Sequence, residues 1–325
     1  MKRLLFLLLG AAVVLGGCTG AGSKKTPLRL LYWNIQNGMW DGQDDDYGRF
    51  VTWVKQQDPD VCVWCEAQPI YKNGTADKLD DLAEWRKDEP LLAFWKELAA
   101  SYGHEYISLS GHRDNYPQVV TSRYPIEAVE RIIGNGADSV VSHGALWARV
   151  QLADKPINIV TLHTWPLKWF MGIDYSQIEE SSAAHGGDFY RALEMQYICE
   201  HTILKAEDPD NEYWMMMGDF NSISIQDNWV YEYEPDDTRF LVHDYILGKT
   251  PYHDIIAERH PGAFFTSTGG RRRIDYVYTT KALRDCVRDA RILTDSYTQP
   301  VRDSLNISNF YHPSDHRPIL VDYAF

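Results

Sequence analysis

The chain has 325 residues, 44% hydrophobic and 24% charged, and its 32 Lys and Arg against 46 Asp and Glu give a formal net charge of −14. This apolar content excludes a disordered chain, and a chain of this length can fold without a disulfide scaffold, against which the odd number of five cysteines also argues. The acidic balance argues against tight, sequence-independent binding of duplex nucleic acid. A nucleic-acid substrate remains open, because a metal ion can supply positive charge locally.

The first residues have the build of an export signal. Two basic residues precede an apolar run from Leu4 to Leu15, which is too short to span a bilayer comfortably. The string Leu15-Gly16-Gly17-Cys18 resembles a bacterial lipobox, in which the cysteine is acylated and becomes the mature N-terminus. We therefore expect a signal peptide over 1–17, a flexible tether over 18–27 and an exported, lipid-anchored protein on the periplasmic or cell-surface side of the envelope. The alternative is an ordinary signal peptide with an incidental cysteine.

After the tether, strand-like runs alternate with helical ones. No repeat or long linker divides them, so one domain is expected over 28–325. Strands are predicted over residues 28–33, 61–65, 105–109, 118–121, 145–152, 157–162, 213–217, 274–278 and 318–323. Helices are predicted over 47–57, over 78–100 with a break at Pro90, and over 189–205 with Leu193, Tyr197 and Leu204 on the apolar side. This alternation indicates an α/β protein in which helices cover sheets.

The cysteines outside the N-terminal segment are interpreted as structural. Cys62 and Cys65 match a C-x-x-C spacing, but they lie within one predicted strand. Residues three apart in a strand point to opposite faces, so we expect neither a redox pair nor a metal clip there. Cys199 and Cys286 stand alone, and each is expected to be a buried thiol.

Residues able to bind a metal or move a proton mark one end of several predicted strands. They are Asn34, Glu66, His163, Asp219 with Asn221, Asp275 inside the strand at 274–278, and Asp315 with His316 just before the last strand. Asp and Asn at strand ends often cap turns, so any one of these residues is weak evidence. Seven or eight of them in succession exceed what turn chemistry produces, and we interpret them as one shared site.

The strings around these positions resemble those of a known family. They are Leu31-Tyr32-Trp33-Asn34, Trp64-Cys65-Glu66, Thr121-Ser122-Arg123-Tyr124-Pro125-Ile126, Thr161-Leu162-His163, Gly218-Asp219-Phe220-Asn221, Arg273-Ile274-Asp275-Tyr276 and Ser314-Asp315-His316-Arg317-Pro318. In this order, from about Leu28 to the C-terminus, the sequence resembles the endonuclease/exonuclease/phosphatase superfamily, the relatives of pancreatic-type deoxyribonucleases. The resemblance implies an α+β fold, a four-layer sandwich of two packed mixed β-sheets flanked by helices, with the active site at one end.

A divalent cation is the cofactor that the resemblance implies. Glu66 is the best candidate metal ligand, with Asn34 adding a neutral carbonyl and Asp315 a second carboxylate. Hard oxygen ligands select Mg²⁺, Mn²⁺ or Ca²⁺ over Zn²⁺. The sequence leaves open whether one ion or two bind.

The remaining strand-end residues are assigned to the chemistry itself. His316 is the expected general base, with its imidazole oriented by Asp275. Asp219 and Asn221 resemble the pair that positions the attacking water and contacts the phosphate. His163 resembles the second histidine of the family, which donates to a phosphoryl oxygen or assists the leaving group.

Further phosphate contacts are expected beside the strand-end residues. Many relatives carry a small residue or Gly-Asn just before the Ser-Arg-Tyr-Pro string, where Gln118 could replace the missing contact. Arg272 and Arg273 run directly into a predicted strand and are a candidate anion clamp, with a solvated turn as the alternative. Arg191 is a weaker candidate.

Loops near the predicted site carry further candidates. The aromatic stretch from Trp165 to Met171 follows His163 and could stack on a base, a sugar or a lipid head group, or merely anchor its loop. The histidines in polar loops that could approach the site are His112, His143 and His185.

The leading prediction is a divalent-metal-dependent phosphodiesterase, with a nuclease as the first choice. The substrate would be a phosphate ester in a nucleic acid, a nucleotide or a lipid head group, and no protein partner is inferred. Alternatives with the same chemistry are a sphingomyelinase-like or an inositol-phosphate phosphatase-like hydrolase. A non-catalytic binding module on the same fold, or a structural envelope lipoprotein, would not need the complete set of acidic residues and histidines.

Overall fold

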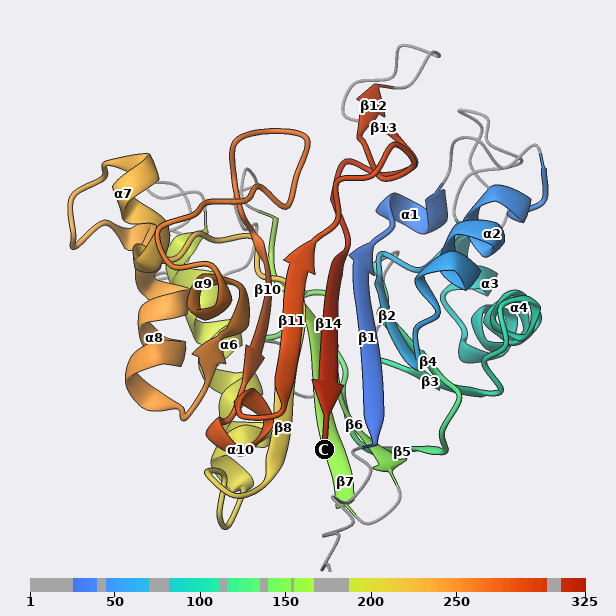
Figure 1. The fold of residues 1–325 in the computed structure, drawn as a ribbon, viewed down its shortest axis with the longest axis horizontal. Coiled ribbons are helices and arrows are strands. Elements are labelled where there is room, and N and C mark those ends of the chain that lie inside the picture. Colours follow the sequence, from blue (N-terminus) through green and yellow to red (C-terminus); the bar gives the residue numbers. More distant parts are fainter. Residues whose placement is uncertain are drawn as a thin grey trace, which may run out of the picture.

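Two sheets packed face to face, with helices on their outer sides, build the protein (Figure 1). The computed structural model describes residues 26–39, 45–69, 82–111, 116–134, 140–152, 155–166, 187–302 and 311–325. Within them both sheets are six-stranded and mixed, so the four-layer α+β sandwich implied by the resemblance is confirmed. The described part includes no helix both long and apolar enough to cross a bilayer. Outside it lie several residues of the predictions, namely 1–25 with Cys18, His112, His185 and the aromatic run 167–171.

The first sheet has the strand order β11-β14-β1-β2-β4-β3. Its strands are β1 (Pro27–Asn34), β2 (Val61–Cys65), β3 (Tyr106–Leu109), β4 (Val119–Ser122), β11 (Val287–Ile292) and β14 (Ile319–Ala324). β2 is parallel to β1, whereas β14 pairs with β1 in the antiparallel direction. The outer face is covered by α2 (Gly48–Gln57) and α4 (Asp88–Ser101), with the short helices α1 (Gln36–Met39) and α3 (Leu82–Trp85) beside them.

The second sheet has the order β5-β6-β7-β8-β10-β9. Its strands are β5 (Ile126–Ile132), β6 (Ala145–Leu152), β7 (Lys155–His163), β8 (Tyr213–Asp219), β9 (His253–Asp254) and β10 (Asp275–Thr279). β7 and β8 run parallel, and β10 is antiparallel to β8. Two longer helices, α6 (Asp188–His201) and α8 (Leu241–Lys249), cover its outer face.

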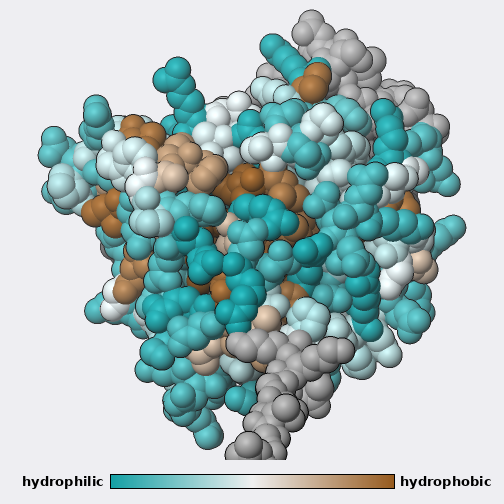
Figure 2. Space-filling model, viewed as in Figure 1, coloured by the Kyte–Doolittle hydropathy of each residue, from teal (hydrophilic) through white to brown (hydrophobic). Residues whose placement is uncertain are grey.

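Short elements complete the described chain. They are the helices α7 (Asn228–Tyr231), α9 (Ile255–Arg259) and α10 (Lys281–Arg284), the 3-10 turns Ile203–Lys205, Ile225–Asp227 and Thr238–Phe240, and the paired strands β12 (Val301–Arg302) and β13 (Tyr311–His312). The face of the molecule that Figure 2 shows is mainly hydrophilic, in keeping with the high net charge.

Burial on both faces of the sheet explains why the sequence of a strand such as β1 is an almost unbroken apolar run. Leu30 and Tyr32 of β1 face the other sheet, whereas Leu31 and Trp33 alternate toward α2 and α4, and all four side chains are fully buried. A strand buried on both faces needs no polar alternation. Burying an aliphatic side chain of this kind contributes roughly 1.5–3 kcal/mol.

The helical segment predicted over 78–100 is divided, but not at Pro90. α4 begins at Asp88, so Pro90 lies in its first turn, and the interruption falls at Arg86 and Lys87. The first backbone N–H groups of a helix have no intrahelical partner, and a proline there costs nothing in hydrogen bonding. Pro90 therefore helps to start a helix rather than to break one.

The apolar side predicted for the third helix is wrong. Leu193 and Leu204 are 41% and 45% exposed. The buried side of α6 instead carries Tyr190, Arg191, Glu194, Met195, Ile198 and Cys199. Asp188, Arg191 and Glu194 are also buried in this helix and hide its hydrophobic periodicity. Arg191 pairs with Asp188 one turn away, whereas Glu194 accepts hydrogen bonds from Ser142 and from the backbone of Trp165 in distant loops.

The prediction for the paired cysteines is confirmed. Cys62 packs on the helix-covered side of the first sheet and Cys65 in the inter-sheet core, and both thiols are free. Burial raises the pKa of both thiols well above the ordinary value. Cys199 is likewise a buried free thiol, whereas Cys286 is only partly buried.

Candidate active site

The polar strand ends predicted from the sequence meet at one end of the sandwich. The parallel strands β1 and β2 of the first sheet and β7 and β8 of the second end there, while the antiparallel strands β14 and β10 begin there. The first sheet brings Asn34, Glu66, Asp315 and His316, and the second brings His163, Asp219, Asn221 and Asp275.

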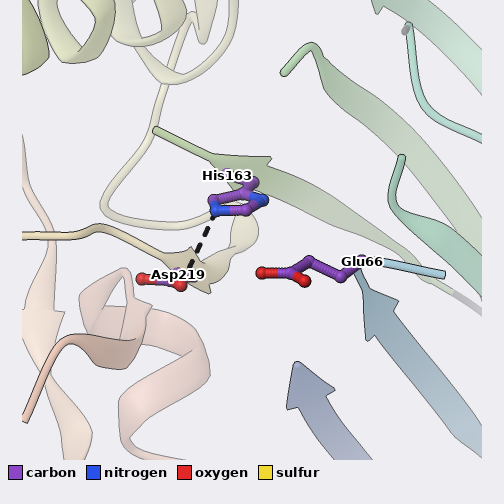
Figure 3. A group of neighbouring side chains, drawn as sticks. All are labelled: Glu66, His163 and Asp219. Carbon is purple, nitrogen blue, oxygen red and sulfur yellow. Dashed lines mark ion pairs between the residues drawn. The ribbon is translucent and has the colours of Figure 1, made fainter. Parts of the chain in front are cut away.

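Glu66, His163 and Asp219 form the centre of the site. Their ligand atoms all lie within 4.8 Å of one another, and the three side chains point toward a common point (Figure 3). Glu66 follows β2, whereas His163 and Asp219 are register partners on β7 and β8, with 3.7 Å between His163 Nε2 and Asp219 Oδ2. The site is therefore divided between the two sheets.

The two carboxylates at the centre have raised pKa values, chiefly because they are buried. Burial, reinforced by the charge of Asp315, raises the pKa of Glu66 to about 7. Burial and then Asp275 raise the pKa of Asp219 to about 8. Within the described ranges neither carboxylate forms an ion pair with a Lys or Arg. Such a cluster of hard oxygen donors fits a divalent cation.

Asn34 contacts both carboxylates through its amide group. Its Nδ2 donates to Glu66 Oε1 and to Asp219 Oδ2, both at 3.1 Å, while its Oδ1 accepts from the backbone N–H of Gln36 at 3.0 Å. The amide oxygen is thus engaged away from the carboxylates. In this arrangement Asn34 is a donor that holds the two acids in place, and ligation of a metal by its carbonyl stays a prediction.

Asp275 and His316 form a buried pair beside this cluster. His316 Nδ1 lies 2.7 Å from Asp275 Oδ2, and its Nε2 lies 3.7 Å from Asp219 Oδ2 and 3.8 Å from Asp315 Oδ1. Burial alone would lower the pKa of His316. The charges of Asp275, Asp315 and Asp219 outweigh this effect, so the pKa lies well above the ordinary value. The ring thus presents Nε2 to the cluster. Asp315 is more exposed than these residues. It belongs neither to the group of ligand atoms from Glu66, His163 and Asp219 nor to the group from Asp219, Asp275 and His316.

His163 and Asn221 are tied to the same corner. Burial, then the charges of His143 and His316, lower the pKa of His163 well below the ordinary value, so this imidazole is neutral. Asn221 adopts a left-handed φ of 45°, donates its backbone N–H to Asp219 Oδ1 at 2.9 Å, and donates Nδ2 to the Thr164 carbonyl at 3.1 Å. It thereby fixes the ends of β7 and β8 against each other.

His143 does reach the site, as its loop position allowed. Its ring centroid lies 4.5 Å from that of His163 and 6.0 Å from that of Trp165, with which it is nearly parallel. The buried amide of Gln118 donates to the carbonyls of Tyr116 and His143 at 3.1 and 3.3 Å. Gln118 therefore supports the wall of the site through the backbone.

Two of the predicted arginines are structural. Arg273 is fully buried, and its guanidinium donates to Asp227 at 2.8 Å and to both oxygens of Asp254 at 3.0 and 2.6 Å. Arg191 is buried too, paired with Asp188, and donates to the backbone carbonyl of Trp165. Neither guanidinium faces solvent, so the prediction of both as anion contacts is wrong, whereas Arg272 is exposed.

Replacing Arg273 by alanine is expected to lower the free energy of unfolding by about 3 kcal/mol, because it leaves two buried carboxylates without their partner. The matched change at the exposed neighbour, Arg272→Ala, is expected to alter it by less than about 0.5 kcal/mol. Urea denaturation measures both. Equal stability of the two variants would contradict the structural role of Arg273.

Several residues that hold the Asp275–His316 pair in place are not predicted from the sequence. Ser314 Oγ donates to the Asn34 carbonyl at 2.7 Å and accepts the His316 backbone N–H at 3.1 Å. Tyr32 Oη and Ser267 Oγ both donate to Asp275 at 2.7 Å. Ser314 and Tyr32 do lie within the strings of the resemblance, but nothing in their local pattern distinguishes a supporting hydroxyl from a packed one.

Comparison with known proteins identifies the family of this chain. The model of the endonuclease/exonuclease/phosphatase family matches residues 31–316. A search of curated proteins finds no match. Among solved structures, an AP endonuclease from Archaeoglobus fulgidus is 14% identical with a TM-score of 0.57, over 91% of this chain and 99% of that one. A 3′ phosphatase from Neisseria bound to a product DNA hairpin is 13% identical with a TM-score of 0.56, over 92% and 100%.

A third similar structure is an endonuclease/exonuclease/phosphatase family protein from Bacteroides thetaiotaomicron, 14% identical with a TM-score of 0.54 over 93% of this chain and 99% of that one. At these identities the structural likeness establishes a shared fold and nothing finer. The family match, in contrast, extends from β1 to His316 and includes every strand end at the site, and it supports a hydrolase of phosphoester bonds. The chain therefore belongs to the endonuclease/exonuclease/phosphatase family, as its motifs predict.

Proposed function

We propose that the protein is a divalent-metal-dependent phosphodiesterase and that its substrate class is nucleic acid. The observation that carries the proposal is that two groups of ligand atoms meet at Asp219, one with Glu66 and His163 and the other with His316 and Asp275. The named activities of the similar structures, an AP endonuclease and a DNA-bound 3′ phosphatase, favour nucleic acid over other phosphate esters.

The donor set fits a divalent cation. Glu66 and Asp219 would hold Mg²⁺ or Mn²⁺, with Asp315 close enough to add its charge. Their pKa values are raised by burial and then by neighbouring carboxylates, and a bound cation would favour their ionised forms. When bound, the ion would act as a Lewis acid on a phosphoryl oxygen. Ca²⁺ and a second ion are compatible with the same oxygens.

The chain's own residues can supply the proton chemistry. The charges of Asp275, Asp315 and Asp219 keep the pKa of His316 high, and a bound cation would offset the charge of the acids beside it. The neutral ring would then take a proton from the attacking water at Nε2, while Asp275 holds the Nδ1 proton and stabilises the imidazolium that forms. Asp219 lies 3.7 Å from the Nε2 atoms of both His316 and His163, where it would orient that water together with Asn221. His163, a neutral imidazole, would donate to a phosphoryl oxygen as charge develops there.

A lipid head group is the second candidate substrate. The lipobox-like string ending at Cys18 supports a lipid-anchored enzyme of the cell envelope, which would work next to a membrane. Sphingomyelin would then be within reach of the same phosphodiester chemistry, and an inositol phosphate would test a preference for monoesters. A non-catalytic module would not need both the Asp–His pair and the acidic cluster.

Removal of divalent metal is expected to abolish activity. Treating the protein with EDTA should reduce hydrolysis of bis-p-nitrophenyl phosphate by at least about 10²-fold, because a Lewis acid of this kind supplies several kcal/mol of transition-state stabilisation. Mg²⁺ or Mn²⁺ should restore the rate. Parallel assays on DNA, RNA, sphingomyelin and inositol phosphates would then identify the substrate, and full activity in EDTA would contradict the proposal.

A further inference from the structure

We propose that Tyr32 is a positioning residue for the Asp275–His316 pair and holds its carboxylate from the opposite sheet. The inference rests on the proposed function, since it gives Tyr32 a part in the action of the general base. Tyr32 lies on β1 in the first sheet and Asp275 opens β10 in the second, so the contact spans the core between the sheets.

The contact between Tyr32 and Asp275 is a short, buried hydrogen bond. Tyr32 is fully buried, and its Oη donates to Asp275 Oδ1 at 2.7 Å. Burial, then the charge of Asp275, raises the pKa of Tyr32 well above the ordinary value, so the phenol keeps its proton and remains a donor. Packed sheets lie about 10 Å apart, a gap that a long side chain with a terminal hydroxyl can bridge to reach a carboxylate.

The other oxygen of Asp275 is held by different donors. Asp275 Oδ2 accepts from Ser267 Oγ at 2.7 Å and faces His316 Nδ1 at the same distance. Ser267 Oγ itself accepts the backbone N–H groups of Ile274 and Asp275 at 3.0 Å, so its one proton is directed to the carboxylate. Each carboxylate oxygen thus has its own hydroxyl donor.

The two hydroxyl donors, one on each oxygen, fix the plane of the Asp275 carboxylate. Because Tyr32 holds Oδ1, the carboxylate cannot rotate, and Oδ2 stays aligned with the imidazole. Among the described residues, Tyr32 supplies the hydrogen bond that Oδ1 accepts. Without the phenol, a buried carboxylate oxygen would be left in an apolar core, and the aspartate would reorient or share the His316 proton.

Tyr32→Phe tests the inference with the ring kept in place. We expect kcat to fall by about 10–100-fold with KM unchanged, the loss typical of an outer hydrogen-bond partner that orients a functional imidazole. The matched control is Tyr323→Phe, because Tyr323 of β14 is buried in the same core and its hydroxyl has no hydrogen-bond partner among the described residues. That variant should keep kcat within about twofold. Equal kcat values for the two variants would overturn the inference.

Two further measurements separate positioning from a general loss of structure. In an Asp275→Asn background, Tyr32→Phe should produce no additional loss of kcat, whereas fully additive losses would show that Tyr32 acts elsewhere. The NMR resonance of the His316 Nδ1 proton should shift in Tyr32→Phe and stay unchanged in Tyr323→Phe; an unchanged resonance in both would contradict the proposal. This signal needs no substrate, so it distinguishes failure of the inference from failure of the proposed function.

Discussion

Replacing His316 by alanine is expected to lower kcat for bis-p-nitrophenyl phosphate by about 10²–10⁴-fold, the contribution usual for a positioned general base. The imidazole is the group whose Nε2 faces the acidic cluster while Nδ1 is held by Asp275 at 2.7 Å. Alanine removes proton acceptance at this point but leaves Glu66 and Asp219 in place. Steady-state kinetics with saturating Mn²⁺ measures the loss, and KM should change little.

His201→Ala is a suitable control for this change. His201 ends α6, where its Nδ1 contacts the carbonyl of Tyr197 and its ring stacks on the Tyr197 ring. The variant should retain the wild-type kcat. If His316→Ala retained it as well, the assignment of the base would be wrong, whatever the fold of the site.

The second large effect is expected for Glu66→Gln, which should lower kcat by about 10³-fold at a fixed metal concentration, because weaker binding of the cation removes most of its Lewis-acid contribution. Glutamine keeps the shape of the side chain but not its charge. Isothermal titration with Mn²⁺ should give a dissociation constant raised by at least tenfold, and excess metal should recover part of the rate.

This loss should not come from unfolding. Burial raises the pKa of Glu66 from 4.5 to about 7 in the absence of metal. Ionisation of this carboxylate therefore lowers the stability progressively between those pH values, and the full cost is present at pH 8. Glu66→Gln should therefore be at least as stable as the wild type at pH 8, measured by urea denaturation in EDTA. The exposed Glu105→Gln is the control for activity. Metal affinity unchanged in Glu66→Gln would exclude this residue as a ligand.

The sequence is most informative where local pattern and local structure coincide. β2 spans residues 61–65 as predicted, because both of its faces are buried and its apolar run is continuous. The strand ends are also predictable, because parallel neighbours end at the same edge and their terminal polar residues are conspicuous after apolar runs. These two facts were sufficient to bring Glu66, Asp219 and His316 into one hypothesis.

Long-range polar contacts are what the sequence conceals. Arg273 follows two exposed arginines, and nothing nearby indicates that Asp227 and Asp254 bury it. The amide of Asn34 has two polar ends, and only the surrounding donors and acceptors decide which one faces the acids. Such contacts depend on partners tens to hundreds of residues away, so periodicity carries no trace of them.

The order of the strands has a consequence for when the enzyme becomes active. β14, the last strand of the chain, inserts between β11 and β1, and His316 lies three residues before it. Residues up to His316 must therefore have left the ribosome before its imidazole can meet Glu66, which lies far earlier in the chain. A nascent chain that has not yet reached this point holds Glu66 without its histidine partner, so the site is completed late in synthesis.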